Sequence, residues 1–448
     1  MSRRNLLLLF AAGLVSYACY VRGEQNPYAR YVAAGYSVVN RWSLEEVPDQ
    51  ELFEGAMRGM VTVLGKHGDE HSLFIGEQER EEFREELTQE FGGVGVRIRL
   101  LGQPPLPTVV GPPEPGAPAF TADIRSGDRL LSINGESTQA MELIDVLRHM
   151  RGPVGEPVVL SLVHAGETEP LEITLTRSVI IDESILGDVR DDDNQWDYRL
   201  AQEPRIGYLQ VIKFGDKTEA ELTSALATLS ADGVKALILD VRDNYGGALD
   251  AAVGITDLFL RAGQPIVTTR ARDGVTRDRF VSTRRGGYTQ IPLVVLVNHN
   301  SASASEILAA CLQDYGRATI VGQRSYGKGT VQQLLRMESG RSLLKLTSAT
   351  YWRPSGTNIH RMQGASESDD WGVKPDKGFE VALDAEEYLQ WRQYRRRRDV
   401  FGDRRDEPLV EQFDAQDGEL PEEFVDRALE LAVVYLVEQL DQPGSPER

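Results

Sequence analysis

The chain has 448 residues, which is too long for one ordinary hydrophobic core and predicts two or three domains. With 41% hydrophobic and 26% charged residues, its composition is that of a globular protein and excludes general disorder. The formal net charge of −20 argues against nucleic acid or an anionic membrane surface as the main partner.

The N-terminal segment is typical of an export signal. Arg3 and Arg4 form a short positive region, and the almost wholly apolar run Leu6–Tyr20 follows them. A transmembrane helix needs about 20 apolar residues, so this run is short for a span and fits a signal better.

Three fates of this segment remain open. Residues 1–22 are expected to be a cleaved signal peptide or, through residues 5–21, a membrane anchor. A lipid-modified Cys19 is the third alternative. Each of them places the rest of the chain outside the cytoplasm, in the cell envelope, as a periplasmic or membrane-anchored protein.

Residues 27–88 are expected to form a helical N-terminal segment. In 28–42 and 46–65, apolar residues recur at spacings of three and four. Pro48 separates the first run from the bulk of the second. The charged run 77–86 is typical of a solvated helix face.

Residues 89–178 have a different pattern, rich in turns and short strands. Seven prolines fall within 104–118, so this stretch is not expected to be a helix interior or a central strand. The segment SGDRLLSING (126–135) predicts a tight turn, an apolar strand and a second turn at its end. This order resembles a PDZ domain, a module that captures the C-terminal carboxylate of a peptide with backbone N–H groups. In that resemblance the carboxylate loop is formed by Gly93, Val94, Gly95 and Val96.

Residues 179–385 alternate between strand and helix patterns. Residues 205–215 are expected to form a strand pair, followed by an amphipathic helix over 219–233. The runs 234–241 and 291–298 are almost continuously apolar, which is typical of parallel strands buried on both faces. The alternation predicts an α/β fold with a largely parallel sheet covered by helices.

The C-terminal segment and the cysteine and histidine content limit the kinds of site that the sequence can form. The C-terminal segment 386–448 is charged and is expected to be helical. Two cysteines, Cys19 and Cys311, cannot form a disulfide framework, and the six histidines show no metal-ligand spacing. No metal and no cofactor are therefore expected.

A serine-rich turn follows the apolar strand at 291–298. Ser301, Ser303 and Ser305 alternate with alanines, and by composition alone any of them could be a nucleophile. A nucleophile at a helix start, among small neighbours, is open to a substrate and lies near unpaired N–H groups that suit an oxyanion. By itself the same pattern is also that of a helix cap.

The segment Tyr326–Thr330 places Lys328 between two glycines. A lysine has a pKa near 10.4, so it must be desolvated and neutral before it can take a proton from a serine hydroxyl. The string GKGT lacks the spacing of a phosphate-binding loop.

Together, the SASASE text (301–306), the lysine turn and the PDZ-like segment resemble the C-terminal processing peptidases, also called tail-specific proteases. The resemblance covers about residues 45–385. It implies a crotonase-like α/β protease core with an inserted PDZ domain, and protein substrates bound by their C-termini. Tyr245 departs from it, because family members usually have proline there.

The resemblance also implies a role for each matching residue. The catalytic residues are Ser303 as nucleophile, Lys328 as base and Gln332, which orients the lysine; the oxyanion donors are Gly246, Gly247 and Ala304; the supporting polar residues are Glu306 and Asp314.

Two other functions use the same sequence features. One is a PDZ scaffold on a catalytically silent core, and the intact motif residues argue against it. The other is a crotonase-like acyl-transfer enzyme, and the export signal argues against it because acyl-CoA substrates are cytoplasmic. Labelling by a serine-reactive probe separates the first alternative from a protease.

Overall fold

The computed structural model describes residues 26–398 and 424–442, apart from short gaps at 103, 111–112, 115, 123, 192–194 and 284–286, and a few isolated residues before 26. Cys19 and most of the expected export signal lie outside the described residues. Among the described residues, no helix combines the length and the apolar character needed to cross a membrane. The chain forms two compact units, one of residues up to Glu77 with Gln332–Thr347, the other of Gln78–Val331 with the chain from Ser348 onward.

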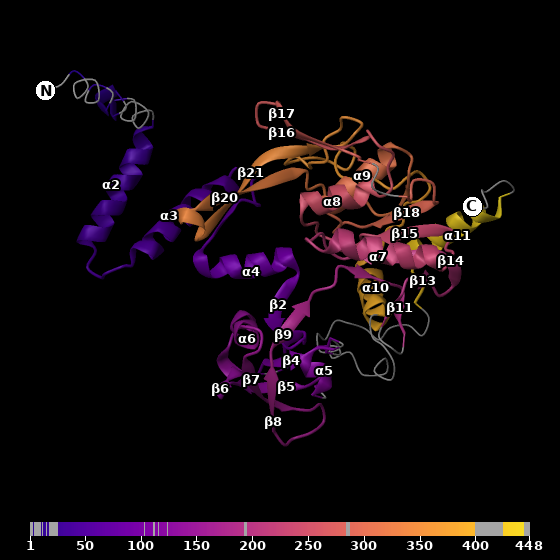
Figure 1. Cartoon of the computed structure of the whole chain (residues 1–448), viewed down its shortest axis with the longest axis horizontal. Coiled ribbons are helices and arrows are strands. Elements are labelled where there is room, and N and C mark those ends of the chain that lie inside the picture. Colours follow the sequence, from indigo (N-terminus) through magenta and orange to yellow (C-terminus); the bar gives the residue numbers. More distant parts are fainter. Residues whose placement is uncertain are drawn as a thin grey trace. The chain divides into compact units, whose positions relative to one another are not determined.

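The first unit holds the N-terminal helices and a short strand (Figure 1). Its elements are α2 (Pro27–Trp42), α3 (Asp49–Gly65), β1 (Leu73–Ile75) and parts of β20 (Thr330–Met337) and β21 (Ser342–Trp352). Strand β1 pairs antiparallel with β21, with Phe74 opposite Leu344. The segment 27–88 is therefore not helical throughout, because apolar residues of β1 pack with α3 around Met57 and Val61.

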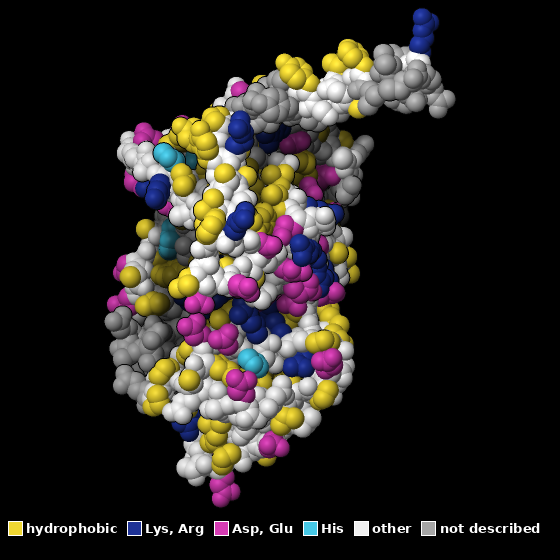
Figure 2. All heavy atoms as spheres, turned by 90° about the vertical axis from the view of Figure 1, so that its left-hand side faces the viewer, with side chains coloured by type: hydrophobic (Ala, Val, Ile, Leu, Met, Phe, Trp, Pro, Cys, Tyr) yellow, Lys and Arg dark blue, Asp and Glu magenta, His cyan; other side chains and the backbone are white. Residues whose placement is uncertain are grey.

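Helix α2 begins and ends with well-defined caps, yet it buries none of its residues. The side chain of Asn26 accepts a hydrogen bond from the N–H of Tyr28, and Pro27 occupies the first turn, where its missing N–H has no effect. Tyr28 and Trp42 are 74% and 76% exposed. Figure 2 views the molecule from the side on which Figure 1 places α2, and hydrophobic side chains lie uncovered there.

The second unit starts with α4 (Glu77–Thr88) and a small antiparallel domain. Its sheet has the order β3-β4-β5-β7-β8, with β6 on β5. The elements are β3 (Ile98–Leu101), β4 (Leu106–Val109), α5 (Pro118–Thr121), β5 (Arg129–Ile133), β6 (Glu136–Ser137), the 3-10 turn η1 (Thr138–Ala140), α6 (Leu143–Met150), β7 (Pro157–Val163) and β8 (Leu171–Thr176). Strands β2 (Glu90–Gly93) and β9 (Ser178–Ile181) pair with each other where the chain enters and leaves it.

Two expectations for this domain have different outcomes. The turn expected at Asn134-Gly135 is present, and both residues have positive φ, as a hairpin turn of this kind requires. The exclusion of a central strand from the proline-rich stretch was wrong, because Pro107 lies in β4 between β3 and β5. Strand β4 pairs with β5 only at Thr108, so the ladder does not need an N–H from Pro107.

The rest of the second unit contains the α/β core. Its sheet has the order β10-β14-β15-β18-β19, with β13 on β14, and the last four strands of that order run parallel. The strands are β10 (Ile185–Leu186), β13 (Arg199–Leu200), β14 (Glu203–Val211), β15 (Ala236–Asp240), β18 (Leu293–Val297) and β19 (Thr319–Gly322). The remaining elements of this unit are the pair β11 (Val189–Arg190) and β12 (Trp196–Asp197), β16 (Pro265–Arg270), β17 (Thr276–Val281) and α10 (Ala385–Arg398). The 3-10 turn η2 (Glu338–Gly340) belongs to the first unit.

Helices cover both faces of this sheet, as the apolar strands predicted (Figure 1). Helices α7 (Thr218–Ala231), α8 (Leu249–Asp257) and α9 (Ala304–Asp314) pack on one face, and α11 (Arg427–Asp441) packs on the other. The expected strand pair at 205–215 is instead one strand, β14. Its Gly207 marks no turn; a side chain there would collide with Leu229 of α7, at 2.7 Å.

Candidate active site

Ser303 lies at the end of the turn that joins β18 to α9, where it is the N-cap of the helix. Its φ of 54° and ψ of −111° are rare for a residue with a side chain, so this backbone must be held by its surroundings. The residue is 7% exposed. Such strain at a helix start is a feature of functional sites.

The carboxylate of Glu306 holds this strained turn. It is fully buried, and its Oε2 accepts the N–H of Ser303 at 2.8 Å. The same oxygen accepts the N–H of Lys328, also at 2.8 Å. The other oxygen accepts the Ser325 hydroxyl at 2.5 Å and the Gly327 N–H at 2.6 Å. One carboxylate therefore joins the serine turn to the lysine turn, and the backbone nitrogens of Ser303 and Lys328 are no farther apart than those two hydrogen bonds allow.

Burial and hydrogen bonding act in opposite directions on Glu306. Burial raises its pKa, the four hydrogen bonds lower it, and the result is a pKa of about 7 against an ordinary value of 4.5. Because the folded protein binds this proton more tightly than the unfolded chain does, the contribution of Glu306 to stability is complete below about pH 4.5 and is lost as the pH rises through about 7.

The variant Glu306→Gln removes this titration. We expect the free energy of unfolding of the wild type, minus that of the variant, to be about 2 to 3 kcal/mol smaller at pH 8 than at pH 5. Chemical denaturation in buffers near pH 5 and pH 8 measures it. A difference that is constant or increases with pH contradicts the assigned pKa.

The turn that carries Lys328 is packed too closely for side chains on either side. A Cβ at Gly327 would lie 2.8 Å from the Cβ of Arg361, and one at Gly329 would lie 2.2 Å from the backbone N of His360. These nearest contacts are both with the segment 360–361. Backbone hydrogen bonds from Arg361 to Gly327 and from Tyr351 to Gly329, at 2.8 and 2.7 Å, fix the turn.

The glycine pair Gly246-Gly247 includes a residue that lies directly beside Ser303. Gly246 has φ of +102°, and a Cβ there would lie 2.8 Å from the Cβ of Ser303 and 3.0 Å from the N of Ala304. The Gly246 N–H donates to the side chain of Asn244 at 2.8 Å. The N–H groups of Gly247 and Ala304 have no acceptor in the part of the chain that the structure describes. These two donors, beside a serine hydroxyl, have the arrangement that an oxyanion requires.

Asp314, another residue from the sequence analysis, lies away from this turn. Asp314, at the far end of α9, pairs with Arg353 at 2.5 Å and accepts the Ser355 N–H at 2.9 Å. Asp314 therefore fixes the loop at residues 353–355 and not the turn of Ser303. Gln332 belongs to the first unit, where its side-chain amide donates to Thr347 at 3.3 Å; its expected action on Lys328 stays a prediction.

Sequence reasoning missed a buried ion pair behind the glycine loop. Arg242 is 2% exposed and bonds the carboxylates of Asp240 and Asp426, with closest distances of 2.6 and 2.8 Å. Its guanidinium also stacks on Trp391, 4.6 Å from the ring centre. In the sequence, the only signal was the group of charged residues Asp240, Arg242 and Asp243 at the end of a buried strand. The second partner, Asp426 at the N-cap of α11, could not be predicted from that group.

The loop expected to hold a substrate carboxylate is Gly93–Val96. The carbonyl groups of Val94 and Gly95 accept N–H groups of Ala119 and Glu114, which leaves the loop fixed in shape. Within the described chain, no acceptor is found for the N–H groups of Val94, Gly95 and Val96. Strand β3, directly after the loop, is the outer strand of its sheet and contacts α6.

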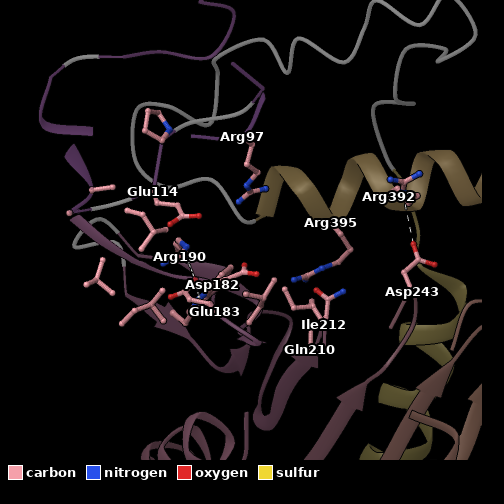
Figure 3. Close-up of a pocket in the computed structure, with 18 of the residues that line it drawn as sticks. Arg97, Glu114, Asp182, Glu183, Arg190, Gln210, Ile212, Asp243, Arg392 and Arg395 are labelled. Carbon is pink, nitrogen blue, oxygen red and sulfur yellow. Dashed lines mark hydrogen bonds and ion pairs between the residues drawn. The ribbon is translucent and has the colours of Figure 1, made fainter. Parts of the chain in front are cut away.

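A pocket of about 700 Å³ lies where this small domain meets the α/β core (Figure 3). Arg97 and Glu114 line it from the small domain, and Arg395 lines it from α10. Burial raises the pKa of the Glu114 carboxyl. Asp243, which also lines the pocket, accepts a hydrogen bond from Tyr388 at 2.8 Å. The pocket therefore reaches the loop that carries the glycine pair.

Comparison with known proteins matches two parts of this chain. Residues 205–377 match the family model described as Peptidase family S41, and residues 109–163 match that of the PDZ domain. The carboxy-terminal-processing protease of Bartonella bacilliformis is 34% identical over 84% of this chain and 86% of that protein. The carboxy-terminal processing protease CtpB of Bacillus subtilis is 30% identical over 75% of this chain and 67% of that protein. The solved structure of the photosystem II D1 C-terminal processing protease is 26% identical, covers 78% of this chain and 92% of its own, and has a TM-score of 0.44.

Proposed function

Because the chain belongs to the carboxy-terminal processing proteases of peptidase family S41, we propose that it is an exported serine endopeptidase in which Ser303 is the nucleophile and Lys328 the base. The observation that carries this proposal is the Glu306 carboxylate, which binds the backbone N–H groups of both residues. A buried carboxylate is costly unless it is hydrogen-bonded, and here the four donors that satisfy it also hold the serine and lysine turns together.

The proposed reaction follows from these positions. Lys328, neutral at the start, takes the proton of the Ser303 hydroxyl as Oγ bonds to the carbonyl carbon of the substrate. The N–H groups of Gly247 and Ala304 stabilise the oxyanion. The carbonyl re-forms as the C–N bond breaks, and Lys328 returns the proton to the leaving amine. Water then attacks the ester and gives a proton to Lys328, which passes it to Ser303 Oγ as the C–Oγ bond breaks and the acid is released.

We propose that the segment 89–178 binds the C-terminus of the substrate. The N–H groups of Val94, Gly95 and Val96 supply donors for a carboxylate, and β3 offers an edge for strand addition. An unstructured protein with an apolar C-terminus is therefore expected to be cleaved faster, about tenfold or more in kcat/KM, than the same protein amidated at its C-terminus. Rates by gel or mass spectrometry measure it, and equal rates for both forms exclude carboxylate capture.

We propose export from the sequence of residues 1–22. The net charge of −20 argues against nucleic acid as a partner. Fractionation of cells is expected to place the protein in the envelope, where added protease reaches its bulk only after the outer barrier is opened. Recovery from the cytosol with Met1 retained contradicts export.

A further inference from the structure

Asn244 lies between the end of β15 and the glycine pair, and it is fully buried. Its side-chain Nδ2 donates to the carbonyl of Val211, the last residue of β14, at 2.7 Å. Its side-chain Oδ1 accepts the N–H of Gly246, two residues further on, at 2.8 Å. This second bond is a turn of the kind that asparagine forms with its own backbone. One amide side chain therefore fixes the start of the glycine loop to the central sheet.

The two hydrogen bonds of Gly246 determine the direction of the next N–H group. Besides the bond to Asn244, the carbonyl of Gly246 accepts the N–H of Phe214 at 3.1 Å. In a trans peptide the N–H points opposite to the carbonyl, so the N–H of Gly247 is directed away from Phe214. Glycines do not select this orientation by themselves, because they adopt positive and negative φ about equally. The bond to Asn244 therefore removes a freedom that the glycine pair would otherwise have.

The backbone carbonyl of Asn244 holds the other side of the proposed site. It accepts the N–H of Ala302 at 3.0 Å and the hydroxyl of Ser305 at 2.9 Å. These two residues flank Ser303 and Ala304 in the sequence. Asn244 therefore bonds the glycine loop through its side chain and the serine turn through its carbonyl.

We propose that Asn244 is a positioning residue that fixes the N–H groups of Gly247 and Ala304 relative to each other, so that one oxyanion accepts from both. The proposal rests on the proposed function, because it concerns the two donors assigned there. Asn244 acts through backbone hydrogen bonds and takes no part in proton transfer. Its effect on the rate is large, because a donor misplaced by about 1 Å lowers a rate about a hundredfold.

The test compares Asn244→Ala with Asn244→Ser. Both variants lose the bond to Val211 and leave a similar space, but the serine hydroxyl can still accept the N–H two residues further on. We expect kcat for a peptide substrate to fall about a hundredfold in the alanine variant and less than about tenfold in the serine variant, with KM unchanged in both.

A peptide aldehyde gives a second measurement on the same pair of variants. Its adduct with the Ser303 hydroxyl places an oxygen where the oxyanion forms, so its affinity is expected to fall by the same factors as kcat. Equal losses in the two variants, or wild-type kcat in Asn244→Ala, overturn the proposal. Wild-type hydrolysis in Ser303→Ala is a different result, because it overturns the proposed function itself.

NMR of the glycine amides in the wild type tests the same point if neither variant folds. On binding of the peptide aldehyde, we expect the amide proton of Gly247 to shift downfield, as for a new hydrogen bond, and that of Gly246 to stay almost unchanged because Asn244 already accepts it. A downfield shift at Gly246 with no change at Gly247 shows that Asn244 does not hold the loop in this way.

Discussion

Replacing Lys328 by arginine is expected to lower kcat/KM for a peptide by about a hundred- to ten-thousandfold, close to the loss in Ser303→Ala. A guanidinium keeps its proton at any working pH, so it cannot act as a base although it preserves the charge. The backbone N–H of Lys328 that bonds Glu306 is unchanged by this substitution, so the turn is expected to stay folded, which thermal unfolding measures.

His360 supplies the control for this prediction. It packs against Gly329, and its Nδ1 is buried with no hydrogen-bond partner within the described chain. Burial lowers its pKa, which favours the neutral imidazole, a form that can act as a base. We expect His360→Gln to retain most activity. Substantial activity in Lys328→Arg that disappears when His360→Gln is added would assign the base to the histidine.

Gly246→Ala is expected to lower kcat by about a hundred- to a thousandfold, the range for loss of an oxyanion donor, because the added Cβ would displace the neighbouring Gly247 or Ala304 N–H. The added Cβ would approach Ser303 Cβ and the carbonyl O of Ala302 to 2.8 Å, so either the serine or the glycine loop must move. Steady-state kinetics with a peptide measures it.

Gly233→Ala is the matched variant, because Gly233 also has positive φ, +75°, but no atom within 4 Å of an added Cβ. It carries the backbone strain of an alanine at positive φ without the collision. We expect it to lose about 1 kcal/mol of stability and none of its kcat. Similar kcat in Gly246→Ala and Gly233→Ala contradicts the account of the glycine loop.

The sequence was sufficient for those parts of the fold that depend on local pattern. The continuous apolar runs at β15 and β18 predicted a buried parallel sheet, and Asn134-Gly135 predicted a hairpin turn, because strand burial and positive φ leave a direct mark on residue choice. The strand pair expected at 205–215 was wrong, because the single strand β14 runs through Gly207, whose missing side chain makes room for Leu229.

The parts that could not be predicted depend on contacts between distant segments. Glu306 was expected to be a supporting residue, but its burial and its donors at Ser325 and Gly327 exist only once two loops meet. Tyr351 and His360 lie on segments whose local sequence is that of an ordinary strand and loop. Their approach to the lysine turn is set by the pairing of β21 and not by spacing along the chain.

The most direct test of the central claim is the site of covalent labelling by a fluorophosphonate. The reagent is incubated with the wild type, Ser303→Ala and Lys328→Arg, and the modified peptide is identified by mass spectrometry. The account predicts one adduct on Ser303 in the wild type, none in Ser303→Ala, and labelling slowed about a hundredfold or more in Lys328→Arg. An active wild type that is labelled at Ser301, at Ser305 or nowhere contradicts it.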